Sequence, residues 1–163
     1  AADVIREVTG SEIAFQNAGG LRADLPEGSI TKGNILDAFP FHNTLVSTTL
    51  NGKQVKTILE QGLSMERGMI QVSGIKAVYD LKRSINNRLL SVEVNGRPLE
   101  IEKKYKVGTQ SFLAQGGDLY KTFLEGEYKD RKVNFSEEII DYLKVNNEIK
   151  EPKKGRLIPK PKG

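Results

Sequence analysis

The chain has 163 residues, of which 37% are hydrophobic and 28% charged, the composition of a globular domain with an ordinary core. It contains no cysteine, which excludes a disulfide framework and a thiolate metal site. The sequence has no apolar run near the ~18 residues of a membrane span. The first residues, Ala1-Ala2-Asp3, show neither an initiator methionine nor a signal-peptide pattern, so we expect the chain to begin inside a longer protein.

The net charge of +4 is unevenly distributed. Residues 150–163 carry six Lys or Arg against one Glu, so the rest of the chain is close to neutral. A globally basic nucleic-acid surface is therefore not expected. We predict one domain at residues 1–149 and a basic, proline-containing extended tail at residues 150–163, which we interpret as a solvated end or a linker. The alternative is a tail that binds nucleic acid.

The N-terminal third is predicted to contain short helices around one buried strand. Residues 1–8 have the apolar spacing of a helix. Residues 12–16 are a short apolar run, which predicts a buried strand. A second helix is predicted over residues 32–38, with Ser29 or Thr31 as its N-cap.

The middle of the chain is predicted to be rich in strands. Residues 44–50 contain many β-branched side chains, and Asn51 is expected to lead into a helix over residues 55–63. Further on, Asn95-Gly96 predicts a hairpin that leads to a strand around residues 105–109. We expect these middle residues to form an antiparallel meander. Its other predicted strands are residues 69–72, 75–81 and 89–94.

The C-terminal part is predicted to be helical before the tail begins. Residues 119–124 are expected to be helical, and Asn134 or Ser136 caps the last clear helix. The prolines beyond it predict an extended end. The whole pattern predicts an α+β fold, with a mixed, largely antiparallel sheet core and flanking helices.

Catalytic chemistry is sparsely represented. His42 is the single histidine, and no G-x-S-x-G motif accompanies it, so a serine-nucleophile triad is not expected. The absence of cysteine and of any H-E-x-x-H spacing argues against a zinc centre. We therefore predict no catalytic residue and no metal ligand in this chain, and we interpret His42 as a rim residue.

Three segments together supply two glycine pairs, two aromatic rings and several polar side chains. We expect each glycine pair to give the backbone positive φ and to let it approach a ligand closely. We also expect the segments to form one concave site with two aromatic walls, a cationic residue and a carboxylate. They are residues 17–22, residues 40–43 and residues 111–118.

Each candidate side chain in these segments also has an ordinary structural interpretation. Arg22 could bind a phosphate or carboxylate through paired hydrogen bonds, or pair with a nearby acidic residue. Asn17 and Asp118 could contact a ligand, or cap the turn and helix that follow them. Phe41 and Phe112 could stack on a flat heterocycle, or belong to the core.

Taken together, the segments resemble the C-terminal domain of the 5′-nucleotidase family. This family includes periplasmic UDP-sugar hydrolases, 2′,3′-cyclic-nucleotide phosphodiesterases and ecto-5′-nucleotidase. The resemblance extends from Ala2 to Tyr120, with a last match at residues 155–158, and many ordered matches make it specific. The matching motifs are residues 17–22, 33–36, 40–43, 50–52, 59–60, 71–74 and 112–120.

The resemblance implies which residues bind the substrate. Phe41 and Phe112 resemble the two rings that sandwich the base. Asn43 resembles an asparagine that contacts the base, and Gly74 a glycine that lines the base pocket. The family usually has glycine where Leu119 stands, which would narrow the pocket beside the ribose.

The sugar and phosphate side is implied in the same way. Asp118 resembles the carboxylate that binds the ribose hydroxyls. Arg22 and Asn17 resemble phosphate-side ligands, and Gly20 lies in the same motif. A further phosphate-binding arginine of the family would lie before Ala1.

The resemblance also implies what lies outside this chain. In the family, an N-terminal metallophosphatase domain supplies two divalent metals and a catalytic His-Asp pair. We thus expect a nucleotide- or nucleoside-binding domain of a phosphohydrolase, inactive alone, with that N-terminal domain as its partner and a periplasmic or extracellular location. The alternative is a non-catalytic binding module that has kept the fold without binding nucleotide.

Overall fold

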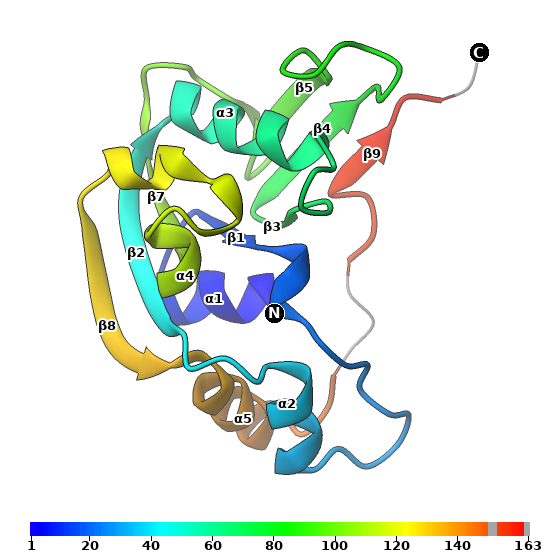
Figure 1. Cartoon of the computed structure of the whole chain (residues 1–163), viewed down its shortest axis with the longest axis vertical. Helices are drawn as coiled ribbons and strands as arrows, with labels where there is room; N and C mark the ends of the chain where they lie inside the picture. Colours follow the sequence, from blue (N-terminus) through cyan, green and yellow to red (C-terminus); the bar gives the residue numbers. More distant parts are fainter. Residues whose placement is uncertain (150–152, 162–163) are drawn as a thin grey trace.

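A computed structural model describes residues 1–149 and 153–161 of the chain (Figure 1). The domain boundary expected between residues 149 and 150 therefore falls at the edge of the described residues. The helices are α1 (Ala2–Thr9), α2 (Lys32–Ala38), α3 (Gly52–Leu63), α4 (Ser111–Ala114) and α5 (Phe135–Asn146), with 3₁₀ turns η1 (Ala18–Gly20), η2 (Gly117–Leu119) and η3 (Lys121–Glu125). The strands are β1 (Ile13–Gln16), β2 (Thr44–Asn51), β3 (Gln71–Ser73), β4 (Ile75–Tyr79), β5 (Leu89–Val94), β6 (Arg97–Pro98), β7 (Lys104–Gln110), β8 (Tyr128–Asn134) and β9 (Leu157–Pro159).

The larger sheet has five strands in the order β3-β1-β7-β2-β8. Its central pair, β2 and β7, is antiparallel and runs in register from Leu45 opposite Gln110 to Asn51 opposite Lys104. β1 pairs in parallel with β7 and antiparallel with β3. The sheet is therefore mixed and mostly antiparallel, which confirms the predicted fold class.

The smaller sheet has four strands in the order β6-β5-β4-β9. The expected single meander is wrong, because only β4, β5 and β6 follow one another in this sheet, while β3 and β7 belong to the larger one. The physical reason is the length of the available partners. β6 has only two residues and offers β7 few backbone partners. β7 instead pairs with β2 at seven positions, and most of the β7 side chains are buried.

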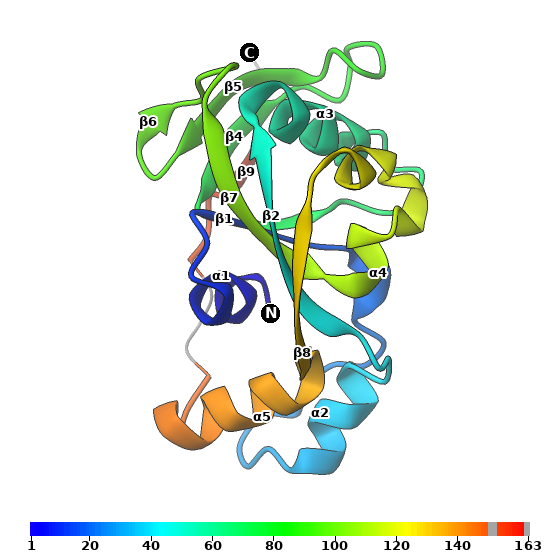
Figure 2. The ribbon, with the colours of Figure 1, turned by 90° about the vertical axis from the view of Figure 1, so that its left-hand side faces the viewer.

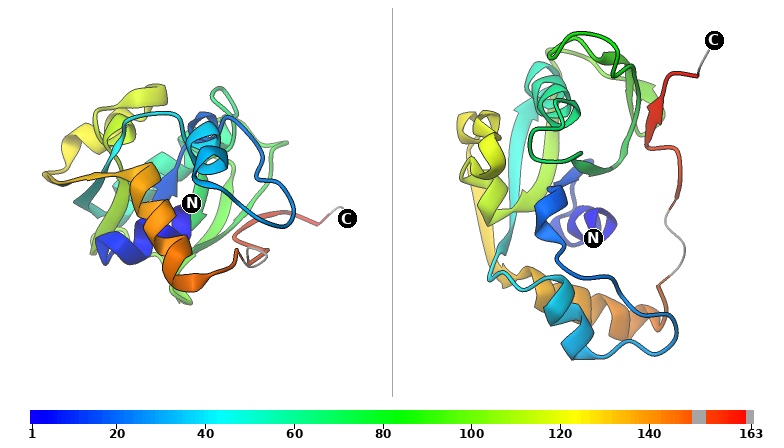
Figure 3. Two further views of the ribbon diagram at one scale, coloured as in Figure 1. Left: turned by 90° about the horizontal axis from the view of Figure 1, so that it is seen from below. Right: turned by 45° about the vertical axis from the view of Figure 1, so that its right-hand side comes forward.

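The described part of the tail contains a strand, so residues 157–159 are not the solvated end that was expected. β9 pairs in parallel with β4, as Figure 3 shows. The amide of Ala77 donates to the carbonyl of Arg156 at 2.7 Å, and the amide of Lys160 donates to the carbonyl of Tyr79 at 2.7 Å. The free edge of β4 provides the unpaired backbone groups that recruit this segment. Of the tail, Lys150, Glu151, Pro152, Lys162 and Gly163 lie outside the described residues.

Two hydrophobic cores lie on the two faces of the larger sheet. The first lies between this sheet, α3 and the smaller sheet, and includes Phe15, Ile58 and Tyr105. The second is formed by α1, α2 and α5, with Ile5, Leu45 and Phe135 among its members. Figures 1 and 2 show α3 at one end of the molecule and the pair α2 and α5 at the other.

The two helices that precede and follow β2 begin at capping boxes. The Thr31 hydroxyl accepts from the amide of Asn34, and the Asn51 side chain accepts from the amide of Gln54. In both boxes the third helical residue bonds back to the cap. These caps confirm Thr31 as the start of α2 and Asn51 as the entry to a helix.

Candidate functional site

The first glycine segment follows β1 and forms the short turn η1. A Cβ on Gly20 would overlap the Gln16 side-chain amide and lie 2.7 Å from Asn17 Oδ1. Gly19 and Gly20 do not have positive φ. The expectation of positive φ is therefore wrong for this pair: Gly20 is required by the space that buried amides occupy.

The second glycine segment follows α4. Gly116 has φ of +80°, as expected, but Gly117 does not have positive φ. A Cβ on Gly117 would lie 2.6 Å from Phe112 Cζ and 2.6 Å from the Phe112 carbonyl oxygen. Gly117 thus leaves the room into which the Phe112 ring packs.

Hydrogen bonds join the two glycine segments. Asn17 Nδ2 donates to Asp118 Oδ2 at 2.7 Å, although the two residues are 101 positions apart. Asn17 is 4% exposed, so this bond lies at the boundary between the interior and the surface. On the other side of Asn17, the Nε2 groups of Gln16 and Gln110 donate to its Oδ1 at 3.1 Å and 2.6 Å.

The two phenylalanines belong to neither hydrophobic core. Phe41 is 47% exposed and Phe112 is 40% exposed. The backbone amide of Thr44 donates to the Ser111 hydroxyl at 3.0 Å, which brings the segment that carries Phe41 to the segment that carries Phe112. The core interpretation is wrong for both rings, which lie on neighbouring surface segments.

Arg22 lies beside Phe41. Its Cζ is 5.9 Å from the centre of the Phe41 ring, within cation–π distance. Its backbone amide donates to the carbonyl of Ala38 at 3.0 Å, which fixes the chain after the turn η1. Within the described residues, Arg22 forms no ion pair with Asp24 or Glu27, so the guanidinium keeps its donors available.

The remaining predicted site residues occupy different places. Asn43 is half-buried two positions after Phe41, and its carbonyl accepts from the amide of Phe135 at 2.8 Å. Gly74 lies outside the group, in the turn between β3 and β4, where a Cβ would overlap the carbonyl oxygen of Glu12. Gly74 contacts Glu12, which precedes β1, whereas Asn17 follows β1. Five residues of extended chain separate Glu12 from Asn17, so Gly74 lies about 16 Å along the strand from Asn17.

A different glycine lies against the first glycine segment. Gly68 has φ of +77°, and a Cβ on it would lie 2.8 Å from the Cβ of Ala18. Gly68 stands in an irregular segment between α3 and β3 and matches none of the motifs from which the candidate residues were predicted. Gly68 therefore leaves the room that the Ala18 side chain occupies beside the first glycine segment.

The loop after Gly117 is conformationally strained. Asp118 has φ of +51° and Leu119 has φ of +70°, and Leu119 is 42% exposed. Leucine rarely adopts this conformation, because its Cβ approaches its own backbone. Tyr120 follows this loop. Burial raises the pKa of the Tyr120 hydroxyl, and the nearby Asp118 carboxylate raises it further, so the hydroxyl is protonated at neutral pH.

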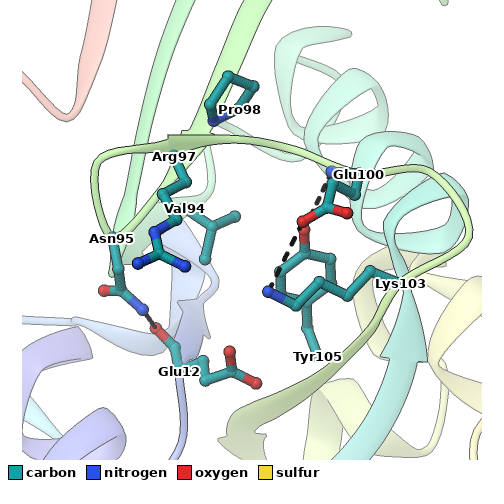
Figure 4. A pocket seen from close by; sticks show the side chains of 8 residues that line it. All are labelled: Glu12, Val94, Asn95, Arg97, Pro98, Glu100, Lys103 and Tyr105. Carbon is teal, nitrogen blue, oxygen red and sulfur yellow. Dashed lines mark hydrogen bonds and ion pairs between the residues drawn. The ribbon is translucent and has the colours of Figure 1, made fainter.

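A hollow of about 240 Å³ lies elsewhere, between β7 and the β5–β6 hairpin (Figure 4). Its lining mixes acidic and basic side chains, and the hydroxyl of Tyr105 already accepts from the amide of Glu100 at 3.0 Å. Asn95 Nδ2 likewise donates to the carbonyl of Glu12 at 3.4 Å. Several of its polar groups thus bond to one another, and none of the predicted site residues lines it.

A sequence profile of the 5′-nucleotidase C-terminal domain matches residues 1–125. The chain belongs to the 5′-nucleotidase family. It corresponds to the C-terminal domain of that family, as the sequence resemblance predicted.

Similar proteins agree with this assignment. The chain is 38% identical to the trifunctional nucleotide phosphoesterase protein YfkN of Bacillus subtilis, over 93% of this chain and 11% of that protein. It is 34% identical to the snake venom 5′-nucleotidase of Crotalus adamanteus, over 87% of this chain and 27% of that protein. The chain thus spans less than a third of the length of these 5′-nucleotidase relatives.

A solved structure has the same fold. The 5′-nucleotidase precursor of Thermus thermophilus superimposes with a TM-score of 0.92 at 35% identity, over 97% of this chain and 34% of that one. The Haemophilus influenzae NAD nucleotidase superimposes with a TM-score of 0.85 at 27% identity, over 98% of this chain and 32% of that one.

Sequence reasoning missed the two glutamines of this 5′-nucleotidase domain. Gln16 and Gln110 are fully buried, with exposures of 0% and 1%, and both contact Asn17. One signal could have found them: each is a polar residue that ends a strand directly before a selected segment. His42 is exposed, and within the described residues it takes part in no hydrogen bond.

Proposed function

We propose that this chain is the nucleotide-binding domain of a 5′-nucleotidase-type phosphohydrolase. The observation that supports this most directly is the placement of Phe41 and Phe112. Two large aromatic rings are excluded from both cores, yet they stand on segments joined by the hydrogen bond between Thr44 and Ser111. Stacking of a base on an aromatic ring contributes about 1–3 kcal/mol, and two rings hold it from both faces.

In this proposal each polar group near the rings binds a different part of the nucleotide. Asn43 contacts the base. The Asp118 carboxylate accepts hydrogen bonds from the ribose hydroxyls. Arg22, whose Cζ lies 5.9 Å from the centre of the Phe41 ring, binds the phosphate with charge-assisted hydrogen bonds.

The hydrolytic chemistry is assigned to an N-terminal domain outside this chain. Among the described residues, no group of three or more His, Asp or Glu side chains could hold a metal ion, so these residues do not fit a metal centre. Two divalent metals in the N-terminal domain would activate the attacking water and stabilise charge on phosphorus. This domain would position the nucleotide for them.

We also propose a periplasmic or extracellular location, as the family implies. One relative is a snake venom protein by name. Within residues 1–149 and 153–161, the helices are all too short or too polar to cross a membrane.

The experiment is a binding titration of the purified chain with adenosine, guanosine, cytidine and uridine, followed by NMR. Phe41→Leu and Phe112→Leu should each weaken the best-binding nucleoside about tenfold, because each removes one stacking surface. Neither should change the melting temperature strongly, because neither ring lies in a core. Tyr128→Leu is the matched control: Tyr128 is 50% exposed on β8, and its loss should leave affinity unchanged.

A second titration separates the phosphate from the nucleoside. The wild-type chain should bind the monophosphate of the chosen nucleoside more tightly than the nucleoside itself, and Arg22→Met should remove that difference. If no nucleoside in the panel binds, the nucleotide proposal is wrong and the non-catalytic module is the better account. Release of phosphate from AMP by this chain with added Mn²⁺ would contradict the assignment of chemistry to another domain.

A further inference from the structure

Three buried side-chain amides form a row behind Asp118. Gln16, Asn17 and Gln110 are 0%, 4% and 1% exposed. Gln110 Nε2 lies 2.6 Å from Asn17 Oδ1, Gln16 Nε2 lies 3.1 Å from the same oxygen, and Asn17 Nδ2 lies 2.7 Å from Asp118 Oδ2. The row therefore connects the interior of the larger sheet to the carboxylate at the surface.

The sheet register places the two glutamines side by side. β1 and β7 pair in parallel, with Ile13 opposite Val107 and Ala14 opposite Gly108. Continued by two residues, the same register sets Gln16 opposite Gln110. Gly20 completes the enclosure, because any side chain there would displace the Gln16 amide and come within 3.2 Å of Gln110 Nε2.

The direction of every hydrogen bond in the row is determined by Asp118. An ionised carboxylate only accepts, so Asn17 must turn its Nδ2 group toward Asp118. Oδ1 of Asn17 then faces inward and needs donors. Both glutamines meet this need with their Nε2 groups, and a reversal of any one amide would place two acceptors or two donors face to face.

This arrangement leaves two acceptors unused. Oε1 of Gln16 and Oε1 of Gln110 are buried and accept no hydrogen bond from the described residues. A buried carbonyl oxygen without a donor is unfavourable, so the glutamines are not arranged for greatest stability. What the arrangement secures is the orientation of Asn17.

We infer that Gln110, assisted by Gln16, is a positioning residue that orients Asp118 for the sugar of the ligand. Gln110 holds Asn17 Oδ1, Asn17 holds Asp118 Oδ2, and Asp118 Oδ1 remains available to accept from ribose hydroxyls. Among the described residues no donor bonds to that second oxygen. The inference rests on the proposed function, because it assigns Asp118 to a ribose.

The first test compares binding of adenosine with that of 2′,3′-dideoxyadenosine, or the same pair for whichever nucleoside binds best. Wild type should prefer the ribonucleoside by about tenfold or more, since hydrogen bonds to a charged group are strong. In Gln110→Glu the new carboxylate only accepts, so it competes with Asp118 for the Nδ2 group of Asn17, and Asp118 loses its fixed orientation. The preference for the ribonucleoside should then fall to about threefold or less.

The second variant separates positioning from stability. Gln110→Met removes both the donor and an unused buried acceptor, and it keeps the side chain's volume. The melting temperature should stay the same or rise, while the ribonucleoside preference falls. A lower melting temperature with an unchanged preference would mean that Gln110 is merely structural, and the inference would be overturned.

The third test uses Asp118→Asn in wild type, in Gln110→Glu and in a control background. In the wild-type background it removes the acceptor for Asn17 Nδ2 and should lower the melting temperature. In the Gln110→Glu background, the amide introduced at position 118 can donate to Asn17 Oδ1 while Asn17 Nδ2 donates to the new glutamate, so the competition between two carboxylates ends and the melting temperature should rise. Gln115→Glu is the charge control: Gln115 is exposed in the same loop, and the sign of the Asp118→Asn effect should not change there.

The two proposals fail in different ways. If the sign reversal is found but no nucleoside binds, the amide row is correct and the ligand assignment is wrong. If a nucleoside binds and the Asp118→Asn effect is the same in all three backgrounds, the nucleotide site stands and the positioning role of Gln110 is overturned.

Discussion

The glycines of the candidate site serve different physical purposes at the residue scale. Gly116 supplies a left-handed turn, with φ of +80°. Gly117 supplies space, since a Cβ there would lie 2.6 Å from both the ring and the carbonyl of Phe112. The two neighbours look alike in sequence, yet one is required by the backbone and the other by an aromatic side chain.

Gly117→Ala should therefore displace the Phe112 ring. The overlap predicts a loss of about 1–3 kcal/mol in the free energy of unfolding, as for other oversized substitutions. Urea unfolding checks the stability, and a nucleoside titration should show weaker binding.

Gly33→Ala is the control: Gly33 lies in α2, where a Cβ would be 3.6 Å from the Thr31 hydroxyl. That change should stabilise the chain by about 0.5–1 kcal/mol. Equal effects at both positions would contradict the packing argument.

Leu119 is a second residue whose backbone matters more than its side chain. With φ of +70°, it carries the strain of a left-handed leucine. Leu119→Ala removes the side chain and keeps the strain, whereas Leu119→Gly removes both. We expect the glycine variant to be more stable than the alanine variant by about 1 kcal/mol, measured by thermal unfolding. An alanine variant as stable as the glycine one would show that the loop relaxes without cost.

At the element scale, the C-terminal strand is held to the first helix by an ion pair. Arg156 Nη2 lies 2.6 Å from Asp3 Oδ2, Arg156 Nη1 donates to the carbonyl of Val72 at 2.9 Å, and the Ser73 hydroxyl donates to Asp3 Oδ1 at 2.5 Å. Burial raises the pKa of the Asp3 carboxyl, but the hydrogen bonds from Arg156 and Ser73 outweigh it and hold the pKa below its ordinary value.

This pKa makes the attachment sensitive to acid. Because the folded pKa of Asp3 lies below the unfolded value of about 3.9, the ionised carboxylate stabilises the chain above that pH. The contribution is lost as the pH falls through the folded pKa. Asp3→Asn should thus lower the free energy of unfolding at neutral pH, and the difference from wild type should shrink below about pH 4.

Urea unfolding at several pH values measures this difference. Asp24→Asn is the matched control, because Asp24 is exposed and its replacement should not change stability. A deficit for Asp3→Asn that stays constant from neutral pH down to about pH 3 would contradict the electrostatic explanation.

At the scale of the whole molecule, the larger sheet belongs to both cores. Ile13 and Phe15 face the first core, while Ala14 between them faces the second. The alternation of side chains along β1 thus couples the α3 side of the molecule to the α1 and α5 side. A sheet shared in this way should make the chain unfold as one cooperative unit.

Substitutions in either core test this coupling. Ile58→Ala in α3 removes a side chain with 0% exposure and should cost about 2–5 kcal/mol. Ile139→Ala in α5, at 5% exposure, should cost less. Both variants should shift one transition that circular dichroism and tyrosine fluorescence report at the same urea concentration. Separate transitions for the two probes would show that the cores unfold independently.

The sequence by itself determined the elements whose signals are local. Thr31 as one of two candidate N-caps, Asn51 as the entry to a helix and the apolar spacing of α3 depend on neighbouring residues, so the structure confirms them. β8 was missed because it is an edge strand, mostly exposed and rich in charged residues, with no alternating pattern. β9 was missed because its short sequence carries no signal until β4 offers it an edge.

Only the tertiary structure decided how the site is assembled. Family motifs selected Asn17, Phe41, Phe112 and Asp118 as candidates, but their proximity depends on bonds between segments that are distant in the chain. The contacts of Gln110 and Gly117 depend on the same long-range packing, and Gly74 lies beside Glu12, at the end of β1 opposite Asn17. Hydrogen bonding and steric exclusion across some 100 residues leave no trace in local spacing, because the chain can satisfy them only once the sheet has formed.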